Sequence, residues 1–136
     1  MKKLKNFILA LNLTYNLVLK SSKIYNGING NIKIPGDKSI SHRSIIIPSI
    51  SQGISEVSNL LISEDVKHTL SAFVAMGVEI KNEGTITVIN GKGLNSLKKP
   101  NKAIYLGNSG TSARLLIGLM VGQNFFKAVF EGDKSL

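Results

Sequence analysis

A lysine and an arginine follow a proline–glycine turn in the segment Pro35-Gly-Asp-Lys-Ser-Ile-Ser-His-Arg43. The segment lies between the short apolar run 31–34 and a second apolar run that contains Ile45–Ile47. A lysine ammonium is a point charge suited to phosphate, whereas the planar arginine fork suits a carboxylate. A glycine turn that opens a helix also offers free backbone N–H groups and the positive end of a helix dipole. We therefore interpret this segment as a binding site for a small anion that carries both groups.

A second segment, residues 107–114, repeats the arrangement as Gly-Asn-Ser-Gly-Thr-Ser-Ala-Arg. The residues that align at one constant offset are Gly36 with Gly107, Ser41 with Ser112, and Arg43 with Arg114. Each copy follows a short apolar run and precedes an apolar helical run, which indicates an internal structural repeat. Two matched turns are better explained by one extended ligand, or by two ligands side by side, than by chance.

Two other interpretations of the first segment are weaker. Taken alone, Gly-x-Lys-Ser is more often an ordinary surface loop with solvated charges. It is also not a Walker A loop, because Ile32 stands where that motif needs its first glycine. The second copy of the arrangement therefore carries the site hypothesis.

Both segments resemble the two N-terminal motifs of 5-enolpyruvylshikimate-3-phosphate synthase, a family also called 3-phosphoshikimate 1-carboxyvinyltransferase. Residues 59–70 and 76–78 resemble that family as well, so the resemblance extends from about Lys23 to Leu136. It implies transfer of the enolpyruvyl group of phosphoenolpyruvate to the 5-hydroxyl of shikimate 3-phosphate, with release of phosphate. This reaction belongs to the shikimate pathway of aromatic amino acid biosynthesis. The resemblance further implies no metal or organic cofactor, a cytoplasmic location and a monomeric full-length enzyme.

The resemblance assigns a role to five residues. Lys38 would lie between the two substrates, contact both of them and act as the catalytic residue. Ser39 and Arg43 would bind shikimate 3-phosphate, with the arginine near its carboxylate. Gly110 would let backbone N–H groups approach phosphoenolpyruvate, and Asn108 would lie at the same cleft.

The resemblance also implies that part of the site lies elsewhere. The reaction needs a proton donor to the methylene carbon and a base for the hydroxyl group. In the family, the carboxylates linked to these roles belong to another part of the chain, and a phosphoenolpyruvate-binding arginine is expected after Leu136. We assign no catalytic role to His42, although it lies within the first motif. We therefore expect residues 23–136 to be an N-terminal fragment that is inactive alone.

Charge and composition restrict the alternatives. The chain of 136 residues has a net charge of +9 and no cysteine, which excludes disulfides and thiolate metal sites within it. The first 23 residues hold five lysines and no acidic residue, so much of the excess charge lies outside the enzyme-like region. We interpret residues 1–22 as a leader or extension, and an interfacial amphipathic helix is the second interpretation.

Three further function classes stay open at this point. A sister enzyme transfers the same group to UDP-N-acetylglucosamine, but its first motif resembles Lys-Asn-Ala and its usual nucleophile is cysteine. A basic nucleic-acid-binding module is disfavoured, because the aromatic residues do not alternate with the lysines. A membrane-binding module would depend on residues 1–22. We expect small-molecule substrates, and neither nucleic acid nor a membrane, as partners.

The sequence predicts an α/β (α+β) fold in which one βαβαββ unit spans residues 31–90 and a second unit begins at residue 103. The predicted elements are strands at 31–34, 55–61, 78–81, 85–89, 103–106 and 125–130, helices at 39–51, from 63 to Gly77 and at 115–121, and a loop at 91–102. We expect Lys38 and Gly110 to lie at helix N-termini that face one concavity.

Local patterns define the two predicted helices of the first unit. Asp37, Ser39 or Ser41 is expected to cap the first helix, and Pro48 to kink or end it. Ser63 is expected to cap the second helix. Its apolar face is predicted to comprise Val66, Leu70, Phe73 and Val74. Because nothing nearby completes a metal set, His68 is interpreted as a partly exposed helix residue.

Overall fold

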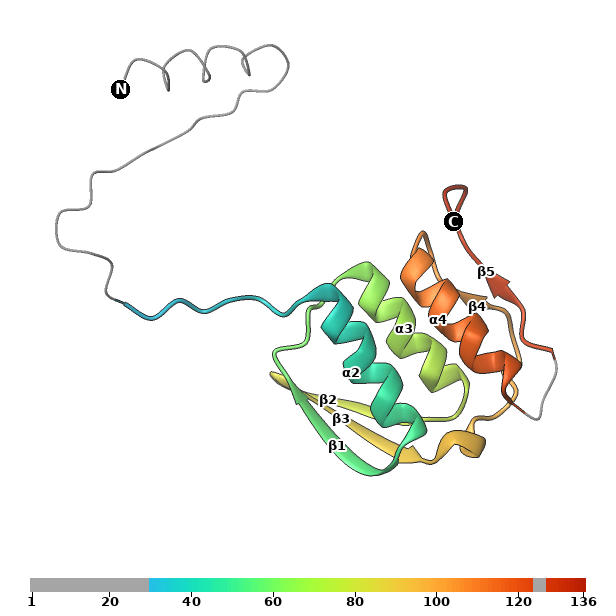
Figure 1. Cartoon of the computed structure of the whole chain (residues 1–136), viewed down its shortest axis with the longest axis horizontal. Coiled ribbons are helices and arrows are strands. Elements are labelled where there is room, and N and C mark those ends of the chain that lie inside the picture. Colours follow the sequence, from blue (N-terminus) through green and yellow to red (C-terminus); the bar gives the residue numbers. More distant parts are fainter. Residues whose placement is uncertain (1–29, 124–126) are drawn as a thin grey trace, which may run out of the picture. The chain divides into compact units, whose positions relative to one another are not determined.

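Two helices lie over one face of an antiparallel sheet, and a third helix lies beside them (Figure 1). The computed structural model describes residues 30–123 and 127–136. Residues 33–136 form one unit, to which all the elements belong. In chain order they are α2 (Lys38–Ile50), β1 (Gln52–Ser58), α3 (Glu64–Ala75), β2 (Glu79–Glu83), β3 (Ile86–Lys92), the 3₁₀ turn η1 (Leu94–Ser96), β4 (Ile104–Tyr105), α4 (Gly110–Val121) and β5 (Phe130–Glu131).

The larger sheet has the strand order β1-β3-β2, and both pairings are antiparallel. β3 is central, and its residues Thr87, Ile89 and Gly91 alternate toward the helices and are buried. β4 and β5 pair in parallel, and α4 makes the crossover that a parallel pair requires. The strand expected at 103–106 is thus confirmed as β4.

Each of the three helices starts after a residue whose side chain accepts a hydrogen bond from the first turn. Asp37 Oδ1 accepts from Ile40 N at 2.7 Å, and Ser63 Oγ accepts from Val66 N at 3.4 Å. Ser109 Oγ accepts from the backbone N–H of the residue three positions later at 3.2 Å. These caps satisfy N–H groups that a helix start leaves free. The caps predicted at Asp37 and Ser63 are confirmed.

The hydrophobic core lies between the helices and the sheets. Its fully buried members include one residue from α2, two from α3, one from β3 and one from α4, namely Ile45, Val66, Phe73, Ile89 and Leu116. Val74 was predicted on the same face of α3 but is 54% exposed, so that assignment is wrong. It follows Phe73 directly, and the 100° step between neighbours in a helix turns it away from the core.

The strand expected at 31–34 is wrong, because residues 31–37 form no regular element. A strand needs a partner strand for its backbone groups, whereas the carbonyl oxygen of Ile34 accepts a hydrogen bond from a side chain, Asn59 Nδ2, at 3.2 Å. The order of elements observed in the first unit is therefore αβαββ.

A helix end at Pro48 is also wrong, since α2 continues to Ile50. The missing N–H of a proline removes one bond of this last turn, and the turn persists.

The strand boundaries differ from the predicted ones, most clearly in β1, β3 and β5. β1 spans 52–58 instead of 55–61, and β3 continues through Lys92, which was expected to be loop. Antiparallel pairing explains both, because Gln52 pairs with Lys92 at the open end of the β1–β3 ladder. β5 is limited to Phe130 and Glu131, while residues 125 and 126 of the predicted strand lie outside the described residues.

The expectation for residues 1–22 also lies outside the described part of the chain. Within residues 30–123 and 127–136, the helices are all too short or too polar to cross a bilayer.

Candidate functional site

The first turns of α2, α3 and α4 lie at one end of the structure, with α3 between the other two helices (Figure 1). Lys38 Nζ, at the start of α2, forms an ion pair with Asp65 Oδ2 in the first turn of α3. Ser112 Oγ, in the first turn of α4, lies 3.5 Å from the Asp65 carbonyl oxygen. Because each helix start carries partial positive charge, this end of the structure favours anions.

The predicted positions of Lys38 and Gly110 at helix N-termini are confirmed, since each is the first residue of its helix. The concavity that they would share stays a prediction. A cavity of about 350 Å³ beside the first motif is lined by residues 34–37, 40–41, 44 and 57–60. It contains neither Lys38 nor any residue of the second motif.

Lys38 is the best-defined cation of the site. Its side chain is 53% exposed, whereas that of its partner Asp65 is only 17% exposed. The ion pair therefore fixes the ammonium group over the first turn of α3 while leaving one side open to a ligand. Sequence reasoning used Asp65 only as a favourable charge at a helix start, because a partner 27 positions away leaves no local pattern.

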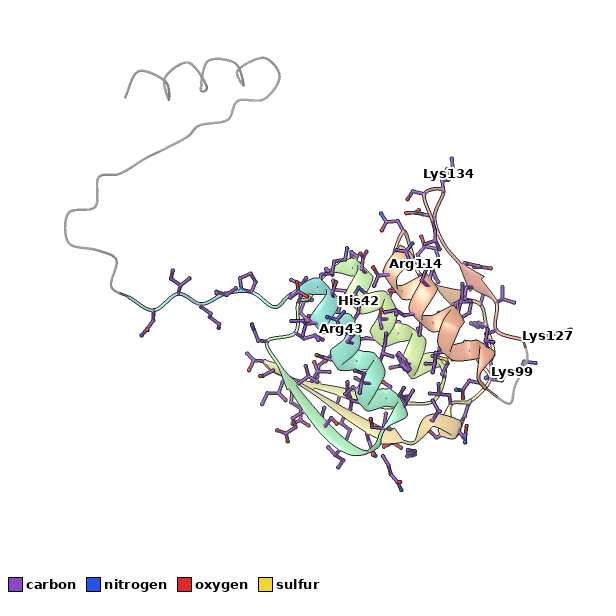
Figure 2. All side chains as sticks on the ribbon, in the orientation of Figure 1. His42, Arg43, Lys99, Arg114, Lys127 and Lys134 are labelled. Atoms are coloured by element: carbon purple, nitrogen blue, oxygen red, sulfur yellow. The ribbon has the colours of Figure 1, made fainter. Side chains whose placement is uncertain are left out.

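The other predicted ligand contacts are accessible. Ser39, Arg43 and Asn108 are exposed. Figure 2 shows Arg43 on α2 and Arg114 on α4, the two arginines that align in the sequence repeat. Arg114 bends back over the start of its own helix, since a Cβ added to Gly110 would lie 3.4 Å from its Nη2 atom. The helices that carry the two arginines flank α3, but Arg43 lines a surface pocket together with residues 55–57 of β1. Their roles as ligand contacts stay predictions.

The two repeated glycines are required by close packing. A Cβ on Gly36 would lie 2.9 Å from Leu61 N and even closer to the Asn59 carbonyl oxygen. Gly107 has a φ of +58°, and a Cβ there would lie 2.5 Å from Cε1 of His68. Each glycine turn thus packs against α3 or the segment that leads into it. His68 is partly exposed, as predicted, and its ring packs edge-on against Tyr105.

A chain of buried polar side chains joins the three helices beneath these turns. His42 Nδ1 lies 2.8 Å from Thr69 Oγ1, which lies 2.8 Å from Ser112 Oγ. Ser112 Oγ in turn lies 2.6 Å from Ser109 Oγ. Sequence reasoning aligned Ser112 within the repeat but missed Thr69 and Ser109. In an amphipathic helix, the sequence around a threonine does not show whether its hydroxyl is buried and joins two other helices or lies at the surface.

Burial lowers the pKa of His42 below its ordinary 6.5. The negative charge of Asp65 opposes this shift, and the positive charge of Lys38 adds to it. The side chain is fully buried, so its protonation would place a charge among apolar atoms. Near neutral pH, His42 is therefore an uncharged hydrogen-bonding group.

This shift predicts a pH dependence of stability. Because the unfolded chain binds the proton more readily than the folded chain, stability is fully present above 6.5 and decreases as pH falls toward the folded pKa. The free energy of unfolding, measured with urea between pH 7.5 and 5, should fall by at most about 1.4 kcal/mol per pH unit. The variant His42→Asn should lack this component, and an unchanged slope in that variant would contradict the assignment.

A sequence model described as EPSP synthase (3-phosphoshikimate 1-carboxyvinyltransferase) matches residues 23–136. The chain belongs to the EPSP synthase family. This finding confirms the resemblance of the two motifs, and it gives no support to the sister enzyme that acts on UDP-N-acetylglucosamine.

Two curated relatives of the EPSP synthase family carry the name 3-phosphoshikimate 1-carboxyvinyltransferase. The protein of Oenococcus oeni is 50% identical over 85% of this chain and 26% of its own length. That of a Geobacter species is 53% identical over 80% of this chain and 25% of its own length. The chain thus spans about a quarter of the length of the curated relatives that it matches.

A solved structure of EPSP synthase from Acinetobacter baumannii matches with a TM-score of 0.74 at 46% identity. The match covers 79% of this chain and 24% of that structure. The predicted fold class, a mixed α/β architecture of the enolpyruvyl transferase type, is confirmed.

Proposed function

We propose that this chain provides the shikimate 3-phosphate side of a 3-phosphoshikimate 1-carboxyvinyltransferase site. The observation that carries the proposal is the common position of the two motifs at the starts of α2 and α4, on either side of α3. The motifs present an exposed lysine, two exposed arginines and two helix N-termini at one end of the structure. A ligand that carries a phosphate and a carboxylate matches this set of cations.

The proposed roles follow from position and chemistry. Lys38 contacts both substrates, because its ammonium group is held between α2 and α3 by Asp65 and stays half exposed. Arg43 and Ser39 bind shikimate 3-phosphate, with the arginine fork at the carboxylate. Gly110 and Asn108 face phosphoenolpyruvate, where a glycine at a helix start leaves room for its phosphate or carboxylate to reach backbone N–H groups.

In the proposed reaction, the 5-hydroxyl of shikimate 3-phosphate takes the enolpyruvyl group and phosphate is released. The hydroxyl needs a base, and the methylene carbon of phosphoenolpyruvate needs a proton donor. Lys38 contributes a fixed positive charge beside both substrates, which stabilises negative charge as the phosphate departs. We also propose, on the basis of the family resemblance, that the full-length enzyme acts as a monomer in the cytoplasm.

A titration of the 136-residue chain with shikimate 3-phosphate, followed by ¹⁵N NMR, tests the proposal. Two or three solvated ionic contacts of about 1 kcal/mol each predict a Kd of roughly 5–30 mM. The amide signals of Lys38, Ser39 and Arg43 should shift during the titration. Shikimate without its phosphate and inorganic phosphate alone should each bind more weakly, because each lacks one of the two charged groups. Shifts confined to other regions would contradict the proposed site.

A further inference from the structure

Thr69 lies at the centre of the buried polar chain and has no role in the function proposed above. Its hydroxyl oxygen is within hydrogen-bond distance of one atom from each of the three helices. It lies 2.8 Å from His42 Nδ1 of α2, 2.8 Å from Ser112 Oγ of α4 and 3.3 Å from the Asp65 carbonyl oxygen of its own helix. His42, Thr69 and Ser112 are fully buried, so water cannot replace these contacts.

The hydrogens of this chain follow from the partners and their distances. A carbonyl oxygen only accepts, and both the Thr69 hydroxyl, at 3.3 Å, and the Ser112 hydroxyl, at 3.5 Å, are within reach of that of Asp65. The shorter contact favours Thr69 as the donor to Asp65, and Thr69 Oγ1 then accepts from His42 and Ser112. Ser112 Oγ then accepts from the Ser109 hydroxyl at 2.6 Å. Ser109 Oγ accepts from the backbone N–H of Ser112. In this arrangement each of the three hydroxyls both donates and accepts.

The arrangement also fixes the tautomer of His42. If Nδ1 carries the hydrogen, it donates to Thr69, and Nε2 is left as a bare acceptor. If Nε2 carried the hydrogen instead, that donor would be buried without a partner among the residues that the structure describes. A buried donor without a partner loses the full energy of its hydration. The Nδ1–H tautomer is therefore favoured.

We propose that Thr69 is a positioning residue that holds the two substrate motifs at a fixed spacing. On one side it holds His42, which directly precedes Arg43 in α2. On the other side it holds Ser112, two residues after Gly110 in α4. The residue that accepts its hydrogen, Asp65, is also the ion-pair partner of Lys38. The first two turns of α3 thereby fix the positions of the cations of the first motif and of the glycine turn of the second motif.

The variant Thr69→Val removes the hydroxyl and keeps the branched shape, whereas Thr69→Ser keeps the hydroxyl and removes a methyl group. The first readout is the ¹⁵N spectrum of the His42 ring in the 136-residue chain. The wild type and Thr69→Ser should show a protonated Nδ1, and Thr69→Val should lose this preference. The amide signals of Arg43 and Gly110 should move in Thr69→Val without any ligand and stay in place in Thr69→Ser.

The second readout is the titration with shikimate 3-phosphate, since this consequence rests on the proposed function. Loss of one or two buried hydrogen bonds should weaken binding about tenfold in Thr69→Val, and Thr69→Ser should restore it. A changed tautomer with unchanged binding and unmoved motif signals would overturn the positioning role. If the wild type itself does not bind shikimate 3-phosphate, the proposed function fails, and the ligand-free amide signals still decide the role of Thr69.

A thermal unfolding curve shows whether Thr69→Val is folded. If it is not, Ser112→Ala breaks the same chain at its α4 end and leaves the His42–Thr69 contact in place. The amide signal of Gly110 should then move while the His42 tautomer is retained. An unmoved Gly110 signal in Ser112→Ala would overturn the proposal.

Discussion

Replacement of Gly91 by alanine is expected to lower the melting temperature of the chain by about 12–24 °C. Gly91 lies in the central strand β3, where the last turn of α2 crosses it. A Cβ at this position would lie under 3.0 Å from the backbone oxygens of both Pro48 and Ser51. Backbone atoms cannot rotate away as a side chain can, so α2 would have to move off the sheet. Such overpacking costs about 3 kcal/mol, and each kcal/mol shifts the melting temperature by about 4–8 °C.

The matched control for this change is Gly118→Ala in α4. A Cβ there meets nothing within 4 Å, and its backbone is helical. Alanine should therefore stabilise the chain by about 0.5–1 kcal/mol. Circular dichroism melts of the two variants and the wild type give the comparison. A Gly91→Ala variant that melts within a few degrees of the wild type would contradict the close approach of α2 to β3.

Replacement of Lys38 by alanine is expected to abolish detectable binding of shikimate 3-phosphate. Lys38 is the cation that the structure holds in place, and its loss also leaves the Asp65 carboxylate without its counter-ion. The unpaired negative charge of Asp65 would then repel the anionic ligand, so the loss exceeds that of one solvated contact of about 1 kcal/mol. The NMR titration described above should lose the shifts at Ser39 and Arg43.

Lys67→Ala is the matched control for Lys38→Ala. Lys67 also lies near the start of α3 and forms an ion pair with Glu64 at 2.8 Å, but it belongs to neither motif. The two variants change the net charge equally, so a general electrostatic effect on the ligand would weaken both. Equal binding by Lys38→Ala and the wild type would show that the site lies elsewhere.

The parts of the fold that depend on neighbouring residues could be predicted from the sequence. The caps Asp37 and Ser63 act on backbone groups three residues away. Gly84 lies between the predicted strands 78–81 and 85–89 and adopts a φ of +63°, which favours glycine in a tight turn. Such features need no knowledge of the rest of the fold.

Features that depend on distant partners could not be predicted in the same way. The run 31–34 has the composition of a strand, but strand pairing requires two segments. Among the described residues, no segment pairs with this run. Thr69 becomes a bridge only because α2 and α4 pack on either side of α3. The pairing of Lys38 with Asp65 likewise arises from the placement of two helix starts.

The spacing between Asp65 and Thr69 has a consequence for which sequence changes the site can tolerate. The two residues are four positions apart, so they lie one above the other on the same side of α3. Insertion or deletion of a single residue between them would rotate Thr69 by about 100° relative to Asp65. Lys38 and Ser112 could then no longer both reach their partners on α3. Divergent relatives that keep this arrangement can exchange side chains within α3, whereas a change in length of that turn would separate the two motifs.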